Sequence, residues 1–184
     1  MIWVLVIVAL LVVVALLLVG LYNRLVRARN RVDNAWAQVE VQLKRRWDLI
    51  PNLVETVKGY AAHERETFQA VTEARAAAQN AKGPAEAAQA EGILSQALGR
   101  LFAVAEAYPE LRATENFQQL QAALNETEDK VAVSRQVYND TVLTYHNAIQ
   151  TLPGSLFAGP FGFTTREFFE VEDTVQREAP KVTF

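Results

Sequence analysis

The chain has 184 residues, with 18 lysines and arginines, 21 aspartates and glutamates and a formal net charge of −3. It contains no cysteine, which excludes disulfides and thiolate catalysis and argues against a lipoprotein anchor. Basic residues show no surplus outside one short arginine cluster, so nucleic acid is not an expected partner. Beyond the apolar N-terminus about 160 residues remain, which is enough for one domain with a hydrophobic core.

The N-terminal stretch 2–21 is apolar throughout, and the first charged residue is Arg24. At about 1.5 Å of rise per residue, this stretch covers roughly 30 Å as a helix, the thickness of a bilayer's hydrocarbon core. A cleaved signal peptide would have a basic start and a shorter apolar run, and a buried core helix is rarely apolar on every face. We therefore expect residues 1–23 to form a transmembrane anchor.

Four arginines precede the first acidic residue, Asp33: Arg24, Arg27, Arg29 and Arg31. Cationic residues beside a span are retained on the cytoplasmic side and attract anionic lipid head groups. These arginines are thus predicted to lie at the membrane interface. The expected topology is a single-pass protein of the inner membrane, with the N-terminus outside and the C-terminal domain in the cytoplasm.

Residues 24–151 carry large apolar side chains at steps of three and four, which is the period of an amphipathic helix. The first stripe, from Val32 to Ile50, indicates that the membrane helix continues directly into the domain. Asp48 and Pro51 then predict a helix end and a restart, because aspartate caps helices and proline is tolerated in a first turn. A kinked but continuous helix is the alternative.

A second helix is expected to end near residues 80–83, and a third to run from Pro84 to just before Pro109. A fourth begins at Thr114 and extends to Thr151. Four apolar faces joined by short connections predict an all-α fold, an antiparallel four-helix bundle continuous with the membrane helix. Residues 152–184 form an irregular tail rich in phenylalanine and glycine.

Several separated blocks of residues resemble the LemA family. The first block comprises Asn34, Trp36, Gln42, Leu43, Arg45, Arg46, Asp48, Leu49, Ile50, Pro51, Asn52, Leu53, Val54, Val57, Tyr60 and Glu64. The second comprises Glu106, Ala107, Tyr108, Pro109, Leu111, Ala113, Glu128, Arg135, Tyr138, Asn139 and Tyr145. A phenylalanine-rich segment, 157–169, is similar to the family's closing motif. The resemblance implies a bacterial protein with one membrane span and a helical bundle, and no catalytic reaction.

The two histidines, His63 and His146, do not belong to a metal-binding or catalytic motif. A di-iron bundle needs Glu-x-x-His on two helices, but positions 60 and 143 are Tyr and Leu. A zincin motif fails because position 67 is Thr. No phosphate-binding loop, dinucleotide fingerprint or nucleophile elbow is present. We therefore expect no catalytic residue, no metal and no cofactor, and a hydrolase or metalloenzyme is the least favoured hypothesis.

Two groups of polar and turn residues are candidates for structure or contact. The first is predicted to form a buried polar network that fixes helix register: Asn52, Glu64, Arg135, Tyr138 and Asn139. The second is predicted to meet at the bundle's distal turns: Asp48, Pro51, Asn52, Tyr108 and Pro109. Simple capping is the alternative role of the second group, and a ligand pocket is the alternative role of the first.

Five phenylalanines of the tail are predicted to need cover, because exposed aromatic rings are costly in water: Phe157, Phe161, Phe163, Phe168 and Phe169. They could fold back on the fourth helix, lie among lipid head groups or contact a partner. The acidic residues that follow, from Glu167 to Glu178, would be repelled by anionic lipid. This charge favours contact with a neighbouring subunit or soluble partner.

The sequence thus predicts a membrane-anchored scaffold or interaction protein of the bacterial cell envelope that acts by contact rather than by turnover. Its expected partners are the lipid bilayer, further copies of the same chain and an envelope or membrane protein. The alternative is a membrane-tethered sensor or adaptor whose bundle binds a small ligand or a protein partner. A polar cavity between the helices would favour the sensor.

Overall fold

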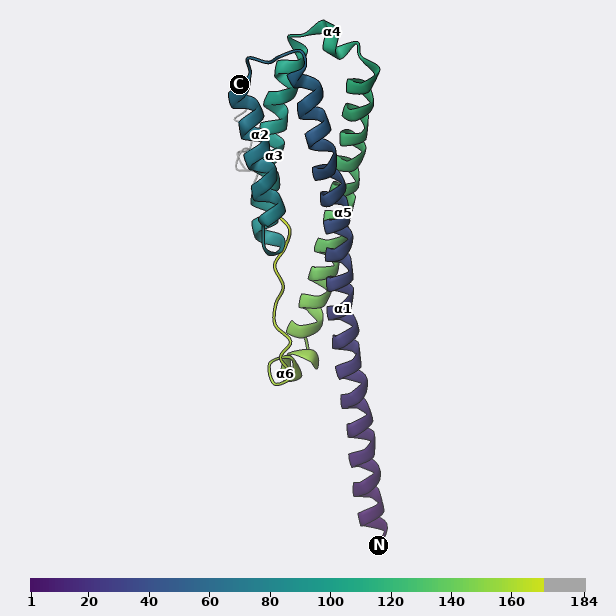
Figure 1. Cartoon of the computed structure of the whole chain (residues 1–184). Coiled ribbons are helices and arrows are strands. Elements are labelled where there is room, and N and C mark those ends of the chain that lie inside the picture. Colours follow the sequence, from purple (N-terminus) through teal and green to yellow (C-terminus); the bar gives the residue numbers. More distant parts are fainter. Residues whose placement is uncertain (171–184) are drawn as a thin grey trace, which may run out of the picture. The chain divides into compact units, whose positions relative to one another are not determined.

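The computed structural model describes residues 1–170, and every regular element in that range is an α-helix (Figure 1). The helices are α1 (Ile2–Lys58), α2 (Arg65–Asn80), α3 (Gly83–Glu106), α4 (Pro109–Arg112), α5 (Glu115–Gln150) and α6 (Gly154–Ala158). The predicted all-α fold is confirmed, and so is the direct continuation of the apolar N-terminal helix into the domain. The acidic end of the predicted tail, 171–184, lies outside the described residues.

The chain forms two compact units, and both α1 and α5 contribute to each of them. The first, here called the stem unit, consists of Met1–Gln38 and Gln136–Arg166. The second, here called the bundle unit, consists of Val39–Arg135 and, among the described residues, 167–170. The predicted four-helix bundle corresponds to the second unit, because only there do α2 and α3 join α1 and α5.

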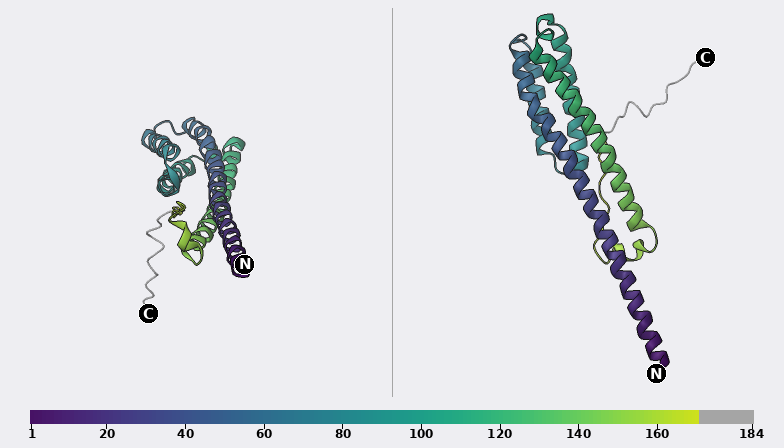
Figure 2. Two further views of the ribbon diagram at one scale, coloured as in Figure 1. Left: turned by 90° about the horizontal axis from the view of Figure 1, so that it is seen from below. Right: turned by 90° about the vertical axis from the view of Figure 1, so that its right-hand side faces the viewer.

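The bundle unit has a continuous apolar core, formed by the apolar faces of its helices. This core includes Ile50, Leu53 and Val57 of α1, Phe68 and Val71 of α2, Leu94, Leu98 and Leu101 of α3, Leu111 of α4, and Phe117 and Leu124 of α5. Alanines fill much of the remaining interface on α2 and α3, which lie side by side (Figures 1 and 2). Small side chains let these two backbones approach closely.

The predicted helix break at Asp48 and Pro51 is wrong, because α1 runs through both residues and ends at Lys58. Proline has no backbone N–H, so Pro51 cannot bond the carbonyl of Trp47, four residues earlier. In the structure the Arg75 Nε–H of α2 donates to that carbonyl oxygen at 2.8 Å. The carbonyl that proline leaves without its helical donor is therefore satisfied from another helix, and α1 continues. The real break is the turn at residues 59–64.

The starts of α3 and α5 follow their local sequence. Gly83 has a φ of 82°, which an L side chain rarely adopts, and it allows the chain to turn sharply from α2 into α3. The backbone N–H of Lys82 donates to the Glu86 carboxylate at 2.9 Å and helps to cap α3. At α5, the Thr114 hydroxyl accepts from the Phe117 N–H at 3.4 Å. Both predicted helix starts are confirmed within a residue.

In the stem unit α1 and α5 lie side by side (Figures 1 and 2). Their buried contact includes Leu25 and Val32 of α1 and Tyr138, Val142 and Tyr145 of α5. The ring of Trp36 also meets that of Tyr138 edge to face, with ring centroids 5.3 Å apart. Helix α5 ends at Gln150, close to the predicted Thr151.

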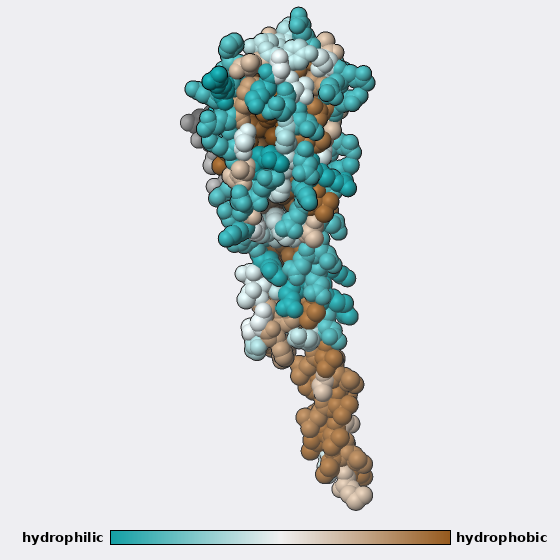
Figure 3. Space-filling view, in the orientation of Figure 1, coloured by the Kyte–Doolittle hydropathy of each residue, from teal (hydrophilic) through white to brown (hydrophobic). Residues whose placement is uncertain are grey.

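The N-terminal part of α1 is apolar and bare, unlike the rest of the helix. Every residue from Met1 to Gly20 is exposed, and the most apolar 18-residue window has a mean hydropathy of 3.5 with none of it buried. Figure 3 shows this segment as a hydrophobic column. By length and composition it can cross a membrane, and a soluble core helix would instead be covered.

Candidate functional site

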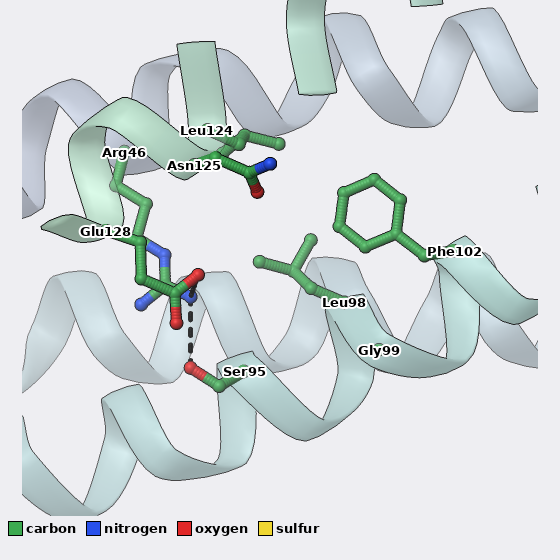
Figure 4. A pocket seen from close by; sticks show the side chains of 8 residues that line it. All are labelled: Arg46, Ser95, Leu98, Gly99, Phe102, Leu124, Asn125 and Glu128. Atoms are coloured by element: carbon green, nitrogen blue, oxygen red, sulfur yellow. Dashed lines mark hydrogen bonds and ion pairs between the residues drawn. The ribbon is translucent and has the colours of Figure 1, made fainter. Parts of the chain in front are cut away.

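A buried ion pair lies in the interior of the bundle unit. Arg46 of α1 is 5% exposed and Glu91 of α3 is 4% exposed, and the Arg46 Nη1 donates to the Glu91 carboxylate at 2.9 Å. The other guanidinium nitrogen, Nη2, donates to the hydroxyl of Ser95 at 3.0 Å (Figure 4). It also lies 3.9 Å from a carboxylate oxygen of Glu128 on α5. Buried charges persist when they are paired and hydrogen-bonded in this way.

Trp47 links this arrangement to α2. Its indole N–H donates to the second carboxylate oxygen of Glu91 at 2.6 Å, while its backbone carbonyl accepts from Arg75 of α2. One set of polar side chains thereby connects α1, α2, α3 and α5. We call this set the polar cluster: Arg46, Trp47, Arg75, Glu91, Ser95 and Glu128.

Burial governs the protonation of Glu91. Loss of water raises the pKa of its carboxyl above the ordinary 4.5, and the Trp47 hydrogen bond and the Arg46 charge only partly oppose this rise. The nearby Glu128 carboxylate adds to the rise. Because desolvation opposes the attraction between the two charges, a buried ion pair such as this one is weak evidence for stability.

A pocket of about 200 Å³ adjoins the polar cluster on the α3 and α5 side. Its polar wall is formed by Arg46, Ser95, Asn125 and Glu128 (Figure 4). Leu98, Gly99, Phe102 and Leu124 form its apolar wall. Glu128 is largely exposed, so the polar side is open to water. The space suits a small polar molecule or a partner's side chain, since guanidinium, carboxylate, amide and hydroxyl groups converge beside an apolar floor.

The residues predicted to form a buried polar network do not form one buried group. Asn52 is exposed, and Glu64 and Arg135 are half-buried in the bundle unit. Tyr138 is buried and Asn139 is half-buried, and both belong to the stem unit. The buried arginine is Arg46 instead. Asn52 was misplaced because the expected helix restart at Pro51 assigned the wrong residues to the second helix.

The predicted distal-turn residues do not all lie at turns. Asp48, Pro51 and Asn52 lie within α1 rather than at a turn, and none of them is buried. Tyr108 and Pro109 do lie at a turn, where Tyr108 precedes the short helix α4 and Pro109 begins it. That helix was not predicted.

An aromatic group closes the stem unit after α5. The Tyr22 ring of α1 meets Phe161 and Phe163 edge to face, with centroids 5.4 and 5.8 Å away. The Arg29 guanidinium lies 5.3 Å from the centre of the Phe163 ring, within range of a cation–π contact. We call the segment 151–166 and its contacts on α1 and α5 the aromatic cap.

Polar contacts hold the end of the aromatic cap. The Tyr145 hydroxyl donates to the Thr164 carbonyl at 2.9 Å, and the Arg166 N–H donates to His146 Nε2 at 2.9 Å. The Arg166 side chain bonds Asp33 of α1 at 3.0 Å. Burial raises the pKa of the Tyr145 hydroxyl above the ordinary 10.0, which favours the protonated form that donates this bond. The chain after α6 is thereby fastened to both long helices.

The five tail phenylalanines have different environments. Phe163 and Phe169 are buried within the chain, at 4% and 1% exposure, which leaves little of either ring for the predicted contact with another subunit. Phe157 and Phe168 are half-buried, and Phe161 is 52% exposed. The turn after α6, where Gly162 has a φ of 70°, points the chain back so that Phe163 faces Tyr22. Phe161 alone among the five leaves most of its ring available.

The remaining candidates are charged residues and histidines. Arg24, Arg27 and Arg31 are exposed on α1, and Arg29 is half-buried. His63 is exposed at the turn between α1 and α2, far along the chain from His146 in the cap. Within residues 1–170, no group of three or more histidine or acidic side chains is placed to hold a metal ion.

The sequence contained a signal for part of the polar cluster. Arg46 lies three residues after Leu43 and four before Ile50, so it falls on the buried stripe of α1. Glu91 lies four residues after Ala87 and three before Leu94, but its neighbours are alanines and mark the face weakly. Arg75 carries no such signal, because its role depends on a proline in another helix.

Comparison with known proteins places these features in a family. The profile of the LemA family matches residues 35–184. Two copies of magnetosome protein MamQ from Paramagnetospirillum magneticum are each 28% identical over 175 residues, covering 81% of this chain and 64% of theirs. Protein LemA of Metamycoplasma hominis is 26% identical over 137 residues, covering 72% of this chain and 61% of its own. The chain thus spans somewhat under two thirds of these relatives. It belongs to the LemA family.

Proposed function

We propose that this protein is a membrane-anchored, non-enzymatic interaction protein of the bacterial cell envelope that works by contact. The observation that carries this proposal is the exposed apolar segment that forms the N-terminal third of α1. Residues 2–20 are exposed and apolar, and they continue without a break into the helices of the domain. Leaving such a column in water would be very costly at about 25 cal/mol per Å², so a bilayer is its natural environment.

The proposed topology is a single span in the inner membrane with the N-terminus outside. Its support is the arginine group after the span, of which three members are exposed. The chain has no cysteine, so one introduced at the exposed position Ala77 of α2, by Ala77→Cys, reports the side directly. In intact cells this thiol should be protected from a membrane-impermeant reagent and become reactive after lysis. Ready labelling in intact cells would reverse the topology.

The proposal includes self-association in the membrane plane. Support comes from α5, which leaves Val133 63% and Val137 47% exposed one helical turn apart. When the full-length Val133→Cys variant is held in membranes by its anchor, we expect it to form disulfide-linked dimers on mild oxidation. The Ala77→Cys variant on α2 is the matched control and should crosslink less. Equal crosslinking of both variants, or a monomeric mass in lipid nanodiscs, would contradict self-association.

A second candidate function is a membrane-tethered sensor or adaptor that binds a small ligand. The pocket beside the polar cluster favours it, because four polar side chains converge there next to Phe102 and Leu98. Native mass spectrometry of protein purified from its own cells tests this function. Gly99 lines the pocket and has no atoms near an added Cβ, so Gly99→Leu would fill the space. A bound small molecule that disappears in Gly99→Leu would support the sensor.

A further inference from the structure

Three large apolar side chains of the segment 151–166 are exposed. Leu152 is 75% exposed, Leu156 is 64% exposed and Phe161 is 52% exposed. They lie on and around α6, in one short segment of the chain. Figure 3 shows pale and brown atoms of this region directly beside the upper end of the hydrophobic column. A cluster of this kind is costly in water and indicates a contact surface.

Contacts with α1 fix the level of this cluster along the helix axis. Phe161 and Phe163 both touch Tyr22, the residue that directly follows the apolar stretch. Trp3 lies near the start of that stretch and Tyr22 just after its end, and the two are about 28 Å apart along the axis, as expected for aromatic residues at the two faces of a bilayer. The cap therefore meets α1 at the level where the span leaves the hydrocarbon.

The point along α1 at which its residues become buried indicates the same membrane level independently. Residues up to Gly20 are exposed, but Leu25 is only 1% exposed. Four residues separate Leu21 from Leu25, which is about 6 Å of helix. The head-group layer of one leaflet is itself roughly 5–8 Å thick, taken as half the difference between a whole bilayer and its hydrocarbon core. The packing of other residues against α1 thus begins within the thickness of the head-group layer.

The charge pattern of the segment also suits this depth. Residues 151–165 contain no charged side chain, so no ionised group would lose its water on entering the interface. The first charges are Arg166, which is paired with Asp33, and Glu167. On α1, Arg24 and Arg27 are exposed next to Tyr22 and can attract anionic head groups.

We propose that the segment 151–163 is a second membrane contact, in which Leu152, Leu156 and Phe161 lie among the lipid head groups beside the exit of α1. This contact rests on the membrane anchoring proposed above. A single span can rotate about its own axis, whereas a span with a second contact on one side presents a fixed face to the lipid. The cap would therefore set the rotation of the stem unit.

Lipid-borne quenchers test the contact in the full-length protein reconstituted in vesicles. The absence of native cysteine allows single fluorescent labels at Leu156→Cys in the cap, Leu143→Cys on α5 and Val8→Cys in the span. Leu143 is the matched control, because it is a leucine of the same unit with 52% exposure. Nitroxides at the head group or high on the acyl chain should quench the label at 156 and leave the label at 143 bright.

The three labels separate the different ways in which the proposal can fail. Quenching at 156 that is no stronger than at 143 would overturn the membrane contact while leaving the anchor intact. A blue-shifted label at 156 that nitroxides cannot reach would also overturn it, and would indicate cover by a second copy. Failure of deep nitroxides to quench the label at Val8 would instead reject the anchor. As a second variant, Leu152→Glu should reduce quenching at 156, because a carboxylate in the segment opposes entry into the interface.

Discussion

In the bundle unit α1 meets α3 at a charged pair, whereas in the stem unit α1 meets α5 through aromatic rings. Arg46 and Glu91 are buried with specific hydrogen-bond partners, and a single substitution would remove the main ionic partner of either one. In the stem, the rings of Tyr22, Trp36 and Tyr138 make edge-to-face contacts, beside polar contacts such as that of Arg166 with Asp33. A directional pair tolerates little change, while ring contacts can adjust. Single substitutions should therefore cost more in the bundle unit than in the stem unit.

The largest effect is expected from Glu91→Ala. Removing the carboxylate leaves the Arg46 charge buried without its main partner, which costs about 3–5 kcal/mol of unfolding free energy. Urea unfolding of the full chain in mild detergent, followed by circular dichroism, measures this loss. The control is the double variant Arg46→Met with Glu91→Leu, which removes both charges and should recover most of the stability. A double variant as unstable as Glu91→Ala would show that the pair is not the source.

A smaller effect is expected from Arg75→Met, which withdraws the donor from the Trp47 carbonyl. Loss of a hydrogen bond from a charged group costs about 1.5–3 kcal/mol. In a Pro51→Ala background the helix regains an N–H for that carbonyl, so the same Arg75→Met change should cost much less. Unfolding of the four proteins in this double-mutant cycle measures the coupling. Strict additivity would refute the link between Pro51 and Arg75.

In the stem unit, Gly154→Ala tests how closely α6 packs against the end of α5. An added Cβ at Gly154 would fall 2.0 Å from the Ala148 carbonyl oxygen, so α6 would have to shift. The expected cost is about 1 kcal/mol, at the low end for overpacking, because α6 is short and can move. Hydrogen exchange should quicken at the Phe163 N–H, which bonds the Ala158 carbonyl. Gly159→Ala is the control, since no atom lies within 4 Å of its added Cβ.

The smallest effect is a pH dependence that comes from Glu91. Its pKa is higher in the folded chain than the ordinary 4.5, so the folded state holds the proton more tightly than the unfolded state. Its contribution is therefore present below pH 4.5 and is lost as the pH rises through the folded value. The stability difference between the natural chain and Glu91→Gln should shift against the natural chain over that interval. A difference that is flat or moves the other way would contradict the burial argument.

The sequence was sufficient for features that depend on local pattern. The apolar length of 2–21, the stripe through Leu43 and Ile50, and the starts at Pro84 and Thr114 each follow from neighbouring residues. Pro51 was misjudged because its effect depends on Arg75, which comes from a different helix. Local rules describe what a proline removes, and only the tertiary structure supplies the replacement.

The candidate sites were harder to predict from the sequence for a similar reason. Arg46 falls on a predicted buried face, but Glu91 is surrounded by alanines that mark no strong stripe. The need of the tail phenylalanines for cover was predictable from their size. Which ring is buried depends on the backbone turn at Gly162, and this turn directs Phe163 inward while Phe161 stays outside.

The hydrogen bond between Arg75 and the Trp47 carbonyl has an evolutionary consequence. Proline at position 51 and a long side-chain donor at position 75 satisfy each other's requirements, and neither requirement exists alone. Across relatives the two positions should therefore covary. Where 51 is occupied by an ordinary helix former, selection on 75 should relax, and that site should drift freely among other polar residues.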